Sequence, residues 1–484
     1  MIAVFKHVKE FPQEDGKELL ALSPLTLFCV SSLQYGIVFD AGSSHTSLFV
    51  YQWPSDKENN TGVVSQTFSC HVDGPGISSY AKNPLQAGES LRKCLDKAMT
   101  VIPTERQQEA PAYLGATAGI RLLRMQNESV AERVLSAVAT VIQQYPVSFH
   151  GARIITGEEE GAYGWITINY LLDSFTKYSA KQQAWVHPQT SNILGALDLG
   201  GASTQISFIP AGPMADATGA SEFRLYGFDY TIYTHSYLCY GQNEALLKLI
   251  QSIVAVRWGR GHPCYPIGYL ETIPATSIYS SPCTAQLQPG LSAASGNVTL
   301  AGTGNATQCR KALQKIFNFS ACSHNQSCTF NGVYQPPVSG EFMAFSAYYY
   351  TFSFLNLTEK QPLDMTQAAI QQFCARNWTE WTYPRQQEQR LRDYCASANY
   401  ILTLLLDVYN FTETTWGSIS FCMQAAGTDI GWTLGYMLNL TNLIPTEAPV
   451  LLRAHKSSIW ATGIFFIVLT LALCLVALLL LLLH

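Results

Sequence analysis

A short strand pattern that ends in aspartate occurs twice in this chain. The first copy, residues 35–39, runs into Asp40-Ala-Gly-Ser-Ser-His-Thr-Ser, and the second, residues 193–197, runs into Asp198-Leu-Gly-Gly-Ala-Ser-Thr-Gln. Short apolar runs that end at glycine turns are typical of buried strands. Because a repeated unit indicates a repeated structure, we predict two lobes, each of which presents a similar hydroxyl-rich loop.

Strand and helix patterns alternate along the chain, which favours a mixed α/β fold. Strands are predicted at the start of 113–121 and at 152–156, helices at 130–144, 162–172, 342–357 and 400–409, and a turn followed by a helix at 428–439. Gly, Pro, Ser and Cys are frequent from 211 to 335, which indicates a loop-rich region held by disulfides. We predict that lobe I comprises residues 35–156 and 424–447 and lobe II residues 157–423, followed by a stalk at 448–458.

The two ends of the chain differ from the region between them. Residues 459–483 carry no charged side chain and exceed the roughly 20 apolar residues that cross a bilayer. We therefore predict a C-terminal transmembrane helix there rather than a buried core helix. Residues 1–34 form an atypical N-terminal segment, because the apolar run 19–33 is short and contains Pro24. This segment is either signal-like or a truncated anchor.

Cysteines and glycosylation sequons indicate an extracellular or lumenal compartment. The chain has 13 Cys, and disulfides persist in that compartment. The cysteine spacings are irregular and include no C-x2-C pair, which disfavours zinc. The net charge of −5 provides no basic surface for a nucleic acid. The predicted glycosylation sites are Asn59, Asn127, Asn297, Asn305, Asn318, Asn325, Asn356, Asn377, Asn410 and Asn439.

The two aspartate loops suggest a phosphate site. Consecutive backbone N–H groups in a glycine-rich turn bind anions, and Ser and Thr hydroxyls add donors. Asp40 and Asp198 would then lie beside the phosphates, and carboxylates are repelled there unless a hard divalent ion, Mg²⁺ or Ca²⁺, intervenes. Mg²⁺ keeps several waters, so both contacts would run through water. The alternative is that each aspartate is a turn or N-cap residue.

Three consecutive acids, Glu158, Glu159 and Glu160, supply a candidate general base for hydrolysis. Their alternative role is to complement a helix dipole at its N-terminus. Thr117 and Arg121 follow another strand, and each is either a site residue or a structural one. The chain has no P-loop and no Gly-x-Ser-x-Gly elbow, which excludes two other hydrolase classes.

Taken together, these motifs resemble the ecto-nucleoside triphosphate diphosphohydrolases, or ecto-apyrases, and their cell-surface branch. Five signature blocks of that family occur in order, at 40–47, 114–123, 155–170, 197–205 and 429–440. The resemblance implies a two-lobed actin-like (RNase H-type) fold, with the nucleotide in the cleft between the lobes. It implies an enzyme of the cell membrane with an extracellular catalytic domain, which would cleave ATP, ADP, UTP and UDP to the monophosphate with Ca²⁺ or Mg²⁺. It leaves a homo-oligomer open.

The resemblance also implies roles for individual residues. Glu160 would be the general base, with Ser203 and Gln205 positioning the water, and Asp40 and Asp198 would hold the hydrated metal. Trp432 would complete the surroundings of the metal and phosphates. The residues that would cradle the phosphates are Ser43, Ser44, His45, Thr117, Gly200, Gly201 and Ala202. Ala347 and Tyr350 would contact the base, the alternative being simple core packing.

Five disulfides follow from the family pattern and not from the residues alone. They are Cys70–Cys94, Cys239–Cys283, Cys264–Cys309, Cys322–Cys328 and Cys374–Cys395, which leaves Cys29, Cys422 and Cys474 unpaired. Two features depart from the pattern. The apolar segment before residue 35 is too short and too interrupted to form the usual spanning helix. Gln242 stands where many relatives carry a basic residue.

Two other functions fit the same fold. A nucleotide-binding protein of the actin or chaperone type would use the cleft to drive lobe motion and would hydrolyse slowly. A sugar kinase would transfer the phosphoryl group to a hydroxyl and would be expected in the cytosol with few cysteines. Glycosylation sequons and many cysteines favour the exported hydrolase.

Overall fold

The computed structural model describes most of the chain between residues 33 and 483. The described residues are 33–54, 64–175, 177–179, 184–186, 193–225, 228–255, 261–285, 296–322, 328–380, 388–440 and 457–483. The predicted N-terminal segment lies almost entirely outside these residues, as do Cys29, Asn59, Asn325 and most of the predicted stalk.

The first lobe is built on a five-stranded sheet with the order β3-β2-β1-β4-β5. Its strands β1, β2 and β3 are antiparallel, and β4 and β5 continue from β1 in parallel. The bounds are β1 Leu33–Ala41, β2 Thr46–Pro54, β3 Ser65–His71, β4 Pro111–Ala116 and β5 Ser148–Ile154. The central strand is buried on both faces, since neither Ile37 nor Val38 is exposed.

The second lobe repeats this arrangement in a sheet with the order β10-β11-β9-β8-β15-β16. Strands β11, β9 and β8 are antiparallel, and β15 and β16 continue from β8 in parallel. The bounds are β8 Gly195–Leu199, β9 Ser203–Phe208, β10 Ala220–Leu225, β11 Phe228–Leu238, β15 Phe342–Ser346 and β16 Ile419–Phe421. Apart from the edge strand β10, the sheet has the pattern of the first, which confirms the predicted duplication.

The duplication places the two aspartates at equivalent positions. Asp40 in β1 pairs with Ser47 in β2, one pair before the turn, and Asp198 in β8 pairs with Gln205 in β9, also one pair before the turn. Both strands end two residues later than their sequence patterns indicated, β1 at Ala41 and β8 at Leu199. The aspartates are therefore strand residues, and the alternative of turn or N-cap roles is wrong for both.

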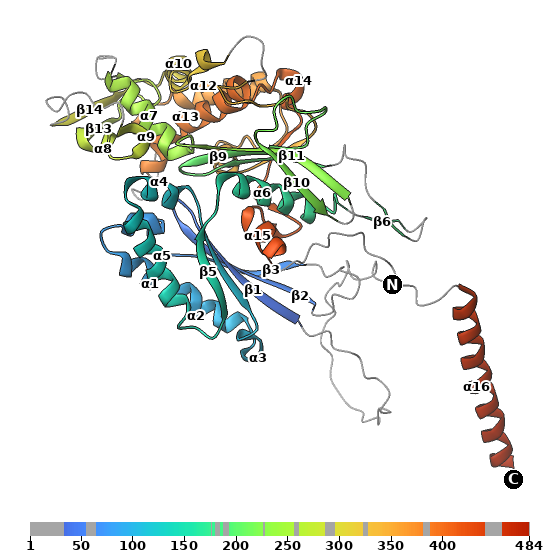
Figure 1. The fold of residues 1–484 in the computed structure, drawn as a ribbon. Helices are drawn as coiled ribbons and strands as arrows, with labels where there is room; N and C mark the ends of the chain where they lie inside the picture. The colour runs from blue at the N-terminus through green and yellow to red at the C-terminus, as the bar shows by residue number, and fades with distance from the viewer. Residues whose placement is uncertain are drawn as a thin grey trace.

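Helices cover the outer faces of both sheets (Figure 1). In the first lobe they are η1 Ile77–Tyr80, α1 Pro84–Ser90, α2 Arg92–Val101, α3 Thr104–Gln107, α4 Ala118–Gln126 and α5 Glu128–Ile142. In the second they are α7 Gln242–Ala255, α8 Ala275–Ile278, α9 Pro282–Ala285, α10 Ala306–Gln314, η3 Phe319–Ala321, α11 Ala347–Phe354, α12 Leu363–Cys374, η4 Trp378–Glu380, α13 Glu388–Leu402, a π-helical turn Thr403–Val408 and α14 Glu413–Trp416. The helix predicted over 342–357 is wrong at its start, because Phe342–Ser346 is the buried strand β15.

Three small sheets complete the described secondary structure. A three-stranded sheet in the second lobe contains β12 Gly261–His262, β14 Asn297–Gly302 and β13 Leu270–Pro274, in that order. Two hairpins are formed by β6 Lys177–Ser179 with β7 Ala184–Val186, and by β17 Gln424–Ala425 with β18 Thr428–Asp429.

Two helices, α6 (Gly157–Leu171) and α15 (Trp432–Leu440), lie between the sheets and join the lobes (Figure 1). One apolar cluster runs through them, from Val38 in the first sheet to Phe345 in the second. The helices approach closely at Gly435, where a Cβ atom would lie 2.2 Å from the carbonyl oxygen of Tyr163. The Gly435 N–H also donates to Thr167 Oγ1 at 2.9 Å. The lobe junction is therefore a tightly packed helix pair.

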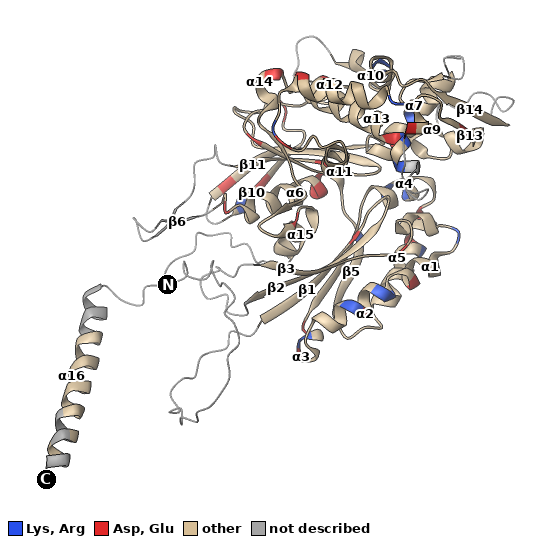
Figure 2. Cartoon of the chain, turned by 180° about the vertical axis from the view of Figure 1, so that it is seen from behind, with Lys and Arg blue, Asp and Glu red and all other residues tan. Residues whose placement is uncertain are grey.

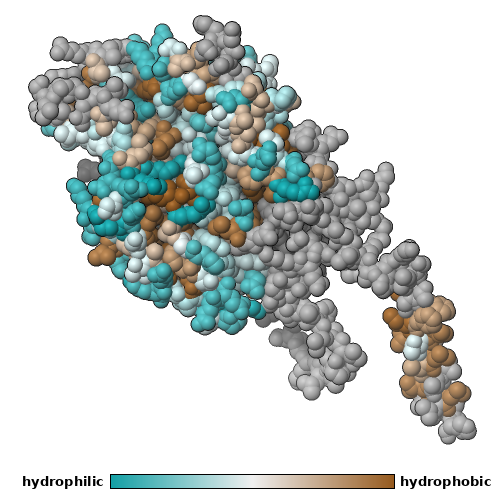
Figure 3. All heavy atoms as spheres, viewed as in Figure 1, coloured by the Kyte–Doolittle hydropathy of each residue, from teal (hydrophilic) through white to brown (hydrophobic). Residues whose placement is uncertain are grey.

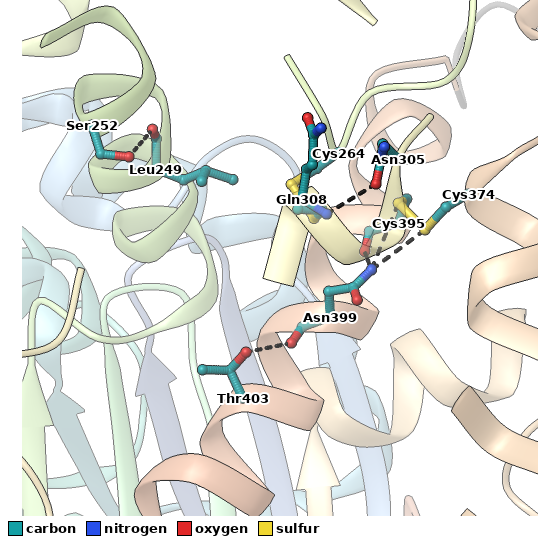
Figure 4. Close-up of a disulfide and its surroundings, with 10 residues drawn as sticks. Leu249, Ser252, Cys264, Asn305, Gln308, Cys374, Cys395, Asn399 and Thr403 are labelled. Atoms are coloured by element: carbon teal, nitrogen blue, oxygen red, sulfur yellow. Dashed lines mark hydrogen bonds between the residues drawn. A yellow bond between two sulfur atoms is a disulfide. The ribbon is translucent and has the colours of Figure 1, made fainter. Parts of the chain in front are cut away.

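All five predicted disulfides are present. Cys70–Cys94 joins β3 to α2, and the other four lie in the second lobe. Figure 4 shows Cys374–Cys395 between α12 and α13, with Asn399 donating its amide to both sulfur atoms. Among the described residues the free cysteines are Cys422 and Cys474, as expected.

The sequon asparagines within the described residues, eight of the ten, are all exposed. Two of them cap helices: the Asn127 side chain accepts from the Val130 N–H, and that of Asn305 from the Gln308 N–H. Exposure leaves room for a glycan at each site, and glycosylation itself stays a prediction.

Helix α16 (Ser457–Leu483) occupies the predicted transmembrane segment, and its described side chains are largely apolar and exposed (Figure 3). Side chains are described only for 464–475, 478 and 480 of this helix. Over the residues whose placement is described, no helix is long and apolar enough to cross a membrane. A membrane-spanning role for this segment stays a prediction.

We expect Gly435→Ala to lower the thermal unfolding midpoint of the whole protein, because the added methyl group would force α6 and α15 apart. Overpacking of this kind typically costs about 1–3 kcal/mol. The matched control is Gly417→Ala, where a Cβ atom would meet nothing within 4 Å. Equal midpoints for the two variants in a thermal melt would contradict the close packing described for this junction.

Candidate active site

The turns after β1 and β8 face each other across the two lobes. Ser43, Ser44 and His45 lie in the first turn, and Gly200, Gly201 and Ala202 in the second. A Cβ atom on Gly201 would lie 2.6 Å from Ser43 Oγ and 3.5 Å from Ser44 Cβ. The sequence predicted that these loops would be similar, and the structure brings them into contact.

Asp40 and Asp198 lie at the base of these turns and are poorly solvated. In each, the Oδ1 oxygen is buried and has no hydrogen-bond partner among the described residues. Burial raises the pKa of Asp40 to about 7, and the charge of Asp198 adds to this while a hydrogen bond from Trp432 opposes it. Burial raises the pKa of Asp198 to about 6, opposed by a hydrogen bond with Ser346. The ionised form of each carboxyl group is therefore unfavourable unless a cation lies beside it.

This pair of carboxylates suits a hydrated divalent cation. Burying a charge is costly unless it is paired or coordinates a metal, and hard cations prefer oxygen ligands. Within the described part of the chain, no group of three or more His, Cys, Asp or Glu side chains is placed to hold a metal ion. Two carboxylates with water as the remaining ligands fit Mg²⁺, which usually keeps several waters, and Ca²⁺ also accepts carboxylate and water oxygens.

The three consecutive glutamates have three different environments at the start of α6. Thr156 and Glu159 form a capping box, in which the Thr156 hydroxyl accepts from the Glu159 N–H at 3.1 Å and the Glu159 carboxylate accepts from the Thr156 N–H at 2.9 Å. Glu158 is exposed, whereas Glu160 is buried. The helix start thus needs one glutamate and directs another toward the loops.

Glu160 is held by a network of polar side chains. It forms an ion pair with Arg121, and Gln205 Nε2 donates to its Oε2 at 3.1 Å. The same Gln205 nitrogen donates to Ser203 Oγ at 2.8 Å, and Arg121 Nη2 reaches Ser203 Oγ at 3.4 Å. Gln205 therefore links Glu160 to Ser203, the three residues that the family resemblance grouped. Arg121 joins them.

The same network relates Glu160 to the two aspartates. Burial raises the pKa of Glu160 to about 8; Arg121 opposes this shift, and the charges of Asp198 and Asp40 add to it. Charges influence a carboxyl group this way only at short range. The backbone agrees, since Gln205, which donates to Glu160, is the strand partner of Asp198. All three acids therefore belong to one site at the facing loops.

Trp432 and Thr117 line the same site from the first lobe. The Trp432 side chain hydrogen-bonds to Asp40 and packs over Gly115, where a Cβ atom would lie 2.3 Å from the indole ring. Thr117 is buried at the start of α4, and its N–H donates to the Ala41 carbonyl at 3.1 Å. Both therefore lie near Asp40, and their roles toward the metal and the phosphates stay predictions.

The exposure of the side chains on helix α11 distinguishes base contact from core packing. Tyr348 and Phe352 are fully buried in the second-lobe core, whereas Tyr350 is 56% exposed and Ala347 is half-buried. Core packing is thus the role of Tyr348 and Phe352, and the Tyr350 ring remains free to contact a base.

Two residues near the site were missing from the sequence prediction, and a third, Gln242, was noted there only for its departure from the family pattern. Ser346, which bonds Asp198, has φ of 56°, a left-handed conformation that is strained for a residue with a side chain. Ser236 in β11 accepts from Gln205 Nε2 at 3.0 Å. Gln242 donates its N–H to the Gly200 carbonyl at 2.8 Å and its side chain to Ser397 at 2.6 Å, so it supports the second loop. No local pattern identifies these residues, because each acts through a distant part of the chain.

Known proteins resemble this chain over nearly its whole length. A family model described as the GDA1/CD39 (nucleoside phosphatase) family matches residues 26–453. Ectonucleoside triphosphate diphosphohydrolase 8 from Bos taurus is 53% identical and covers 94% of this chain and 92% of that protein. The Homo sapiens protein of the same name is 50% identical over the same shares, and ectonucleoside triphosphate diphosphohydrolase 2 from Rattus norvegicus is 47% identical over 93% of each.

A solved structure of nucleoside triphosphate hydrolases from Neospora caninum has a TM-score of 0.58 to this chain at 15% identity, covering 85% of this chain and 93% of that one. This similarity shows the shared fold alone. The five ordered motifs predicted this family and, within it, a similarity to the type numbered eight; the sequence matches confirm both. The chain belongs to the GDA1/CD39 (nucleoside phosphatase) family.

Proposed function

We propose that this chain hydrolyses nucleoside tri- and diphosphates such as ATP, ADP, UTP and UDP to the monophosphate and orthophosphate. The observation that carries the proposal is the single site in which Asp40, Asp198 and Glu160 meet at two facing loops. Relatives about half identical to the chain are named ectonucleoside triphosphate diphosphohydrolases, which supports the same reaction.

The facing loops would hold the phosphate chain between the lobes. Backbone N–H groups at Gly201 and Ala202 and the hydroxyls of Ser43 and Ser44 are the donors that such a chain requires. The Gly200 N–H instead closes the second turn by donating to the Ser203 carbonyl at 3.0 Å. Asp40 and Asp198 would hold Ca²⁺ or Mg²⁺ through water, and the bound cation would neutralise part of the phosphate charge. Tyr350 would stack on the base, beside Ala347, since base stacking tolerates different bases.

Glu160, Ser203 and Gln205 would then carry the chemical step. The oxygen of a water molecule bonds to the terminal phosphorus, opposite the bridging oxygen, as the bond between phosphorus and that oxygen breaks. Glu160 takes a proton from the water, and the shortened nucleotide leaves with the bridging oxygen. Ser203 and Gln205, which contact each other and surround Glu160, would orient the water.

The setting of the reaction is also a proposal. The names of the relatives indicate a cell-surface enzyme. We propose that residues 459–483 anchor the chain in the membrane, with a glycosylated catalytic region outside. We further propose the division into lobe I, residues 35–156 and 424–447, and lobe II, residues 157–423. The two sheets support it, since their strands belong to separate parts of the chain.

Incubation of the purified full chain with ATP should yield ADP, AMP and orthophosphate over many turnovers with Mg²⁺ or Ca²⁺, and chelation of the metal should stop the reaction. A time course of the three nucleotides checks this. A single turnover per protein molecule, or phosphate transfer to an added sugar, would favour a slow nucleotide switch or a kinase instead.

Glu160→Gln should lower kcat by about 10²–10⁴-fold, the usual contribution of a general base, because the amide cannot accept the proton. Glu158→Gln is the matched control: this residue lies in the same helical turn, is exposed, and should keep wild-type turnover. Both variants should show wild-type circular dichroism. A Glu160→Gln variant as fast as the control would remove Glu160 from the chemical step.

Arg121→Gln should shift the acidic limb of the single-turnover cleavage rate to higher pH. Arg121 lowers the pKa of Glu160, so its removal raises that pKa, and a larger fraction of Glu160 is protonated and inactive at neutral pH. Arg133→Gln, an exposed change on α5, should leave the limb in place. The rate is measured against pH with the same metal and nucleotide for each protein, and an unmoved limb in Arg121→Gln would argue against Glu160 as the titrating base.

A further inference from the structure

An open cavity of about 350 Å³ lies beside the Glu160 network, at the junction of the two lobes. It is lined by Arg121, Arg124, Met125, Glu128, Ile154 and Leu238. These residues come from α4, the start of α5 and the ends of β5 and β11. None of them belongs to the two facing loops, so this cavity is distinct from the space between the loops where the phosphate chain would enter.

The Arg121 side chain lies between the cavity and the candidate active site. One side of its guanidinium group contacts Glu160 and Ser203, and the residue also lines the cavity. Its Nε nitrogen is buried and has no hydrogen-bond partner among the described residues. The side chain is therefore held mainly through one end, by the ion pair with Glu160.

The outer part of the cavity is open to solvent and is lined by a second arginine, Arg124. Arg124 and Glu128 form an ion pair at 2.8 Å with side chains 57% and 59% exposed, and Met125 is 64% exposed. Figure 2 shows basic positions on α4 where the lobes meet. Arg121 thus lines the cavity next to Glu160, and Arg124 lines it where it opens to solvent.

We propose that orthophosphate leaves the site through this cavity, past Arg121, while the nucleotide product leaves through the space between the facing loops. The inference rests on the proposed function, because it concerns the second product of that reaction. The terminal phosphate would be cleaved beside Glu160 and Ser203, deep in the site, where the remaining nucleotide blocks the way back between the loops. The route past Arg121 needs no prior departure of the nucleotide.

The chemical step itself would weaken the ion pair that holds Arg121 in place. Before cleavage, the ionised Glu160 holds Arg121 by charge. When Glu160 takes the proton of the attacking water, the ion pair loses its negative member, and the new phosphate becomes the strongest anion next to the guanidinium. Arg121 would then turn with the phosphate toward the cavity and return when Glu160 loses its proton.

The cavity suits passage better than storage. Its volume is more than ten times the roughly 30 Å³ share of one water molecule, which leaves room for a hydrated phosphate. Apart from the two arginines, its lining consists of the apolar side chains Met125, Ile154 and Leu238 and the acidic Glu128. The two arginines are therefore the side-chain hydrogen-bond donors of this lining, and Arg124 is already paired with Glu128, so few donors are free to retain a dianion.

The test is to obstruct the cavity and to follow cleavage and phosphate release separately in one turnover. In Met125→Trp, a larger side chain stands at the cavity mouth without contacting Glu160, Ser203 or the loops. The matched control is Met365→Trp on α12, where the methionine has a similar exposure of 57% and does not line the cavity. Cleavage of ATP is measured after acid quenching, and free phosphate with an optical phosphate sensor, in the metal-loaded full chain.

We expect wild-type cleavage in Met125→Trp, with release of free phosphate delayed by about tenfold or more, which corresponds to about 1.4 kcal/mol added to the barrier. Met365→Trp should show no delay. Arg124→Glu, which reverses the charge at the mouth, is the second variant and should also delay free phosphate without slowing cleavage. Free phosphate that appears as fast as it is cleaved in both cavity variants overturns the proposal. Absence of cleavage in the wild-type protein would instead refute the proposed function.

Discussion

Burial of three carboxyl groups, those of Asp40, Asp198 and Glu160, in one site is the constraint on which the rest of the site depends. Burial raises the pKa of each group; the charge of Asp198 adds to this shift for Asp40, and the charges of both aspartates add to it for Glu160. Arg121 offsets the charge of Glu160 through an ion pair. Each aspartate keeps one buried oxygen without a partner among the described residues. Glu160 is therefore paired with Arg121 of the protein, whereas Asp40 and Asp198 remain suited to bind a divalent ion.

The duplicated sheets explain why the aspartates face each other, but they do not explain the base. Each aspartate occupies the same position in its own lobe, at the end of a central strand. Glu160 has no counterpart: it lies on α6, which follows β5, the last strand of the first sheet, whereas α15, which follows β16 in the second sheet, begins with Trp432 and carries no acidic side chain. Side chains one residue apart on a helix point about 100° apart, so Glu158, Glu159 and Glu160 reach solvent, the helix cap and the site, respectively.

Helices α6 and α15 also connect the chemistry to the lobe junction. Trp432 begins α15, and its indole both bonds Asp40 and covers Gly115, so the position of that carboxylate depends on the packing of this helix. Arg121 similarly belongs to two environments, the Glu160 network and the cavity between α4 and β11. Residues that serve two environments in this way make the site sensitive to small shifts between the lobes.

The sequence by itself determined the duplicated strands, the two aspartates, the acidic helix start and the order of the family motifs, because each depends on a few neighbouring residues. Family resemblance, and not spacing, supplied the disulfide pairs and the roles of Ser203 and Gln205. Local pattern failed at Phe342–Ser346, where an aromatic, apolar stretch was predicted as helix but is a strand buried between β8 and β16. Only the tertiary structure decided that Tyr350 is exposed while Tyr348 is buried, that Ser346 adopts a strained conformation beside Asp198, and that Arg121 separates a cavity from the base. These features arise from contacts between segments far apart in the chain, which depend on how the lobes pack and leave no periodic signal in the sequence.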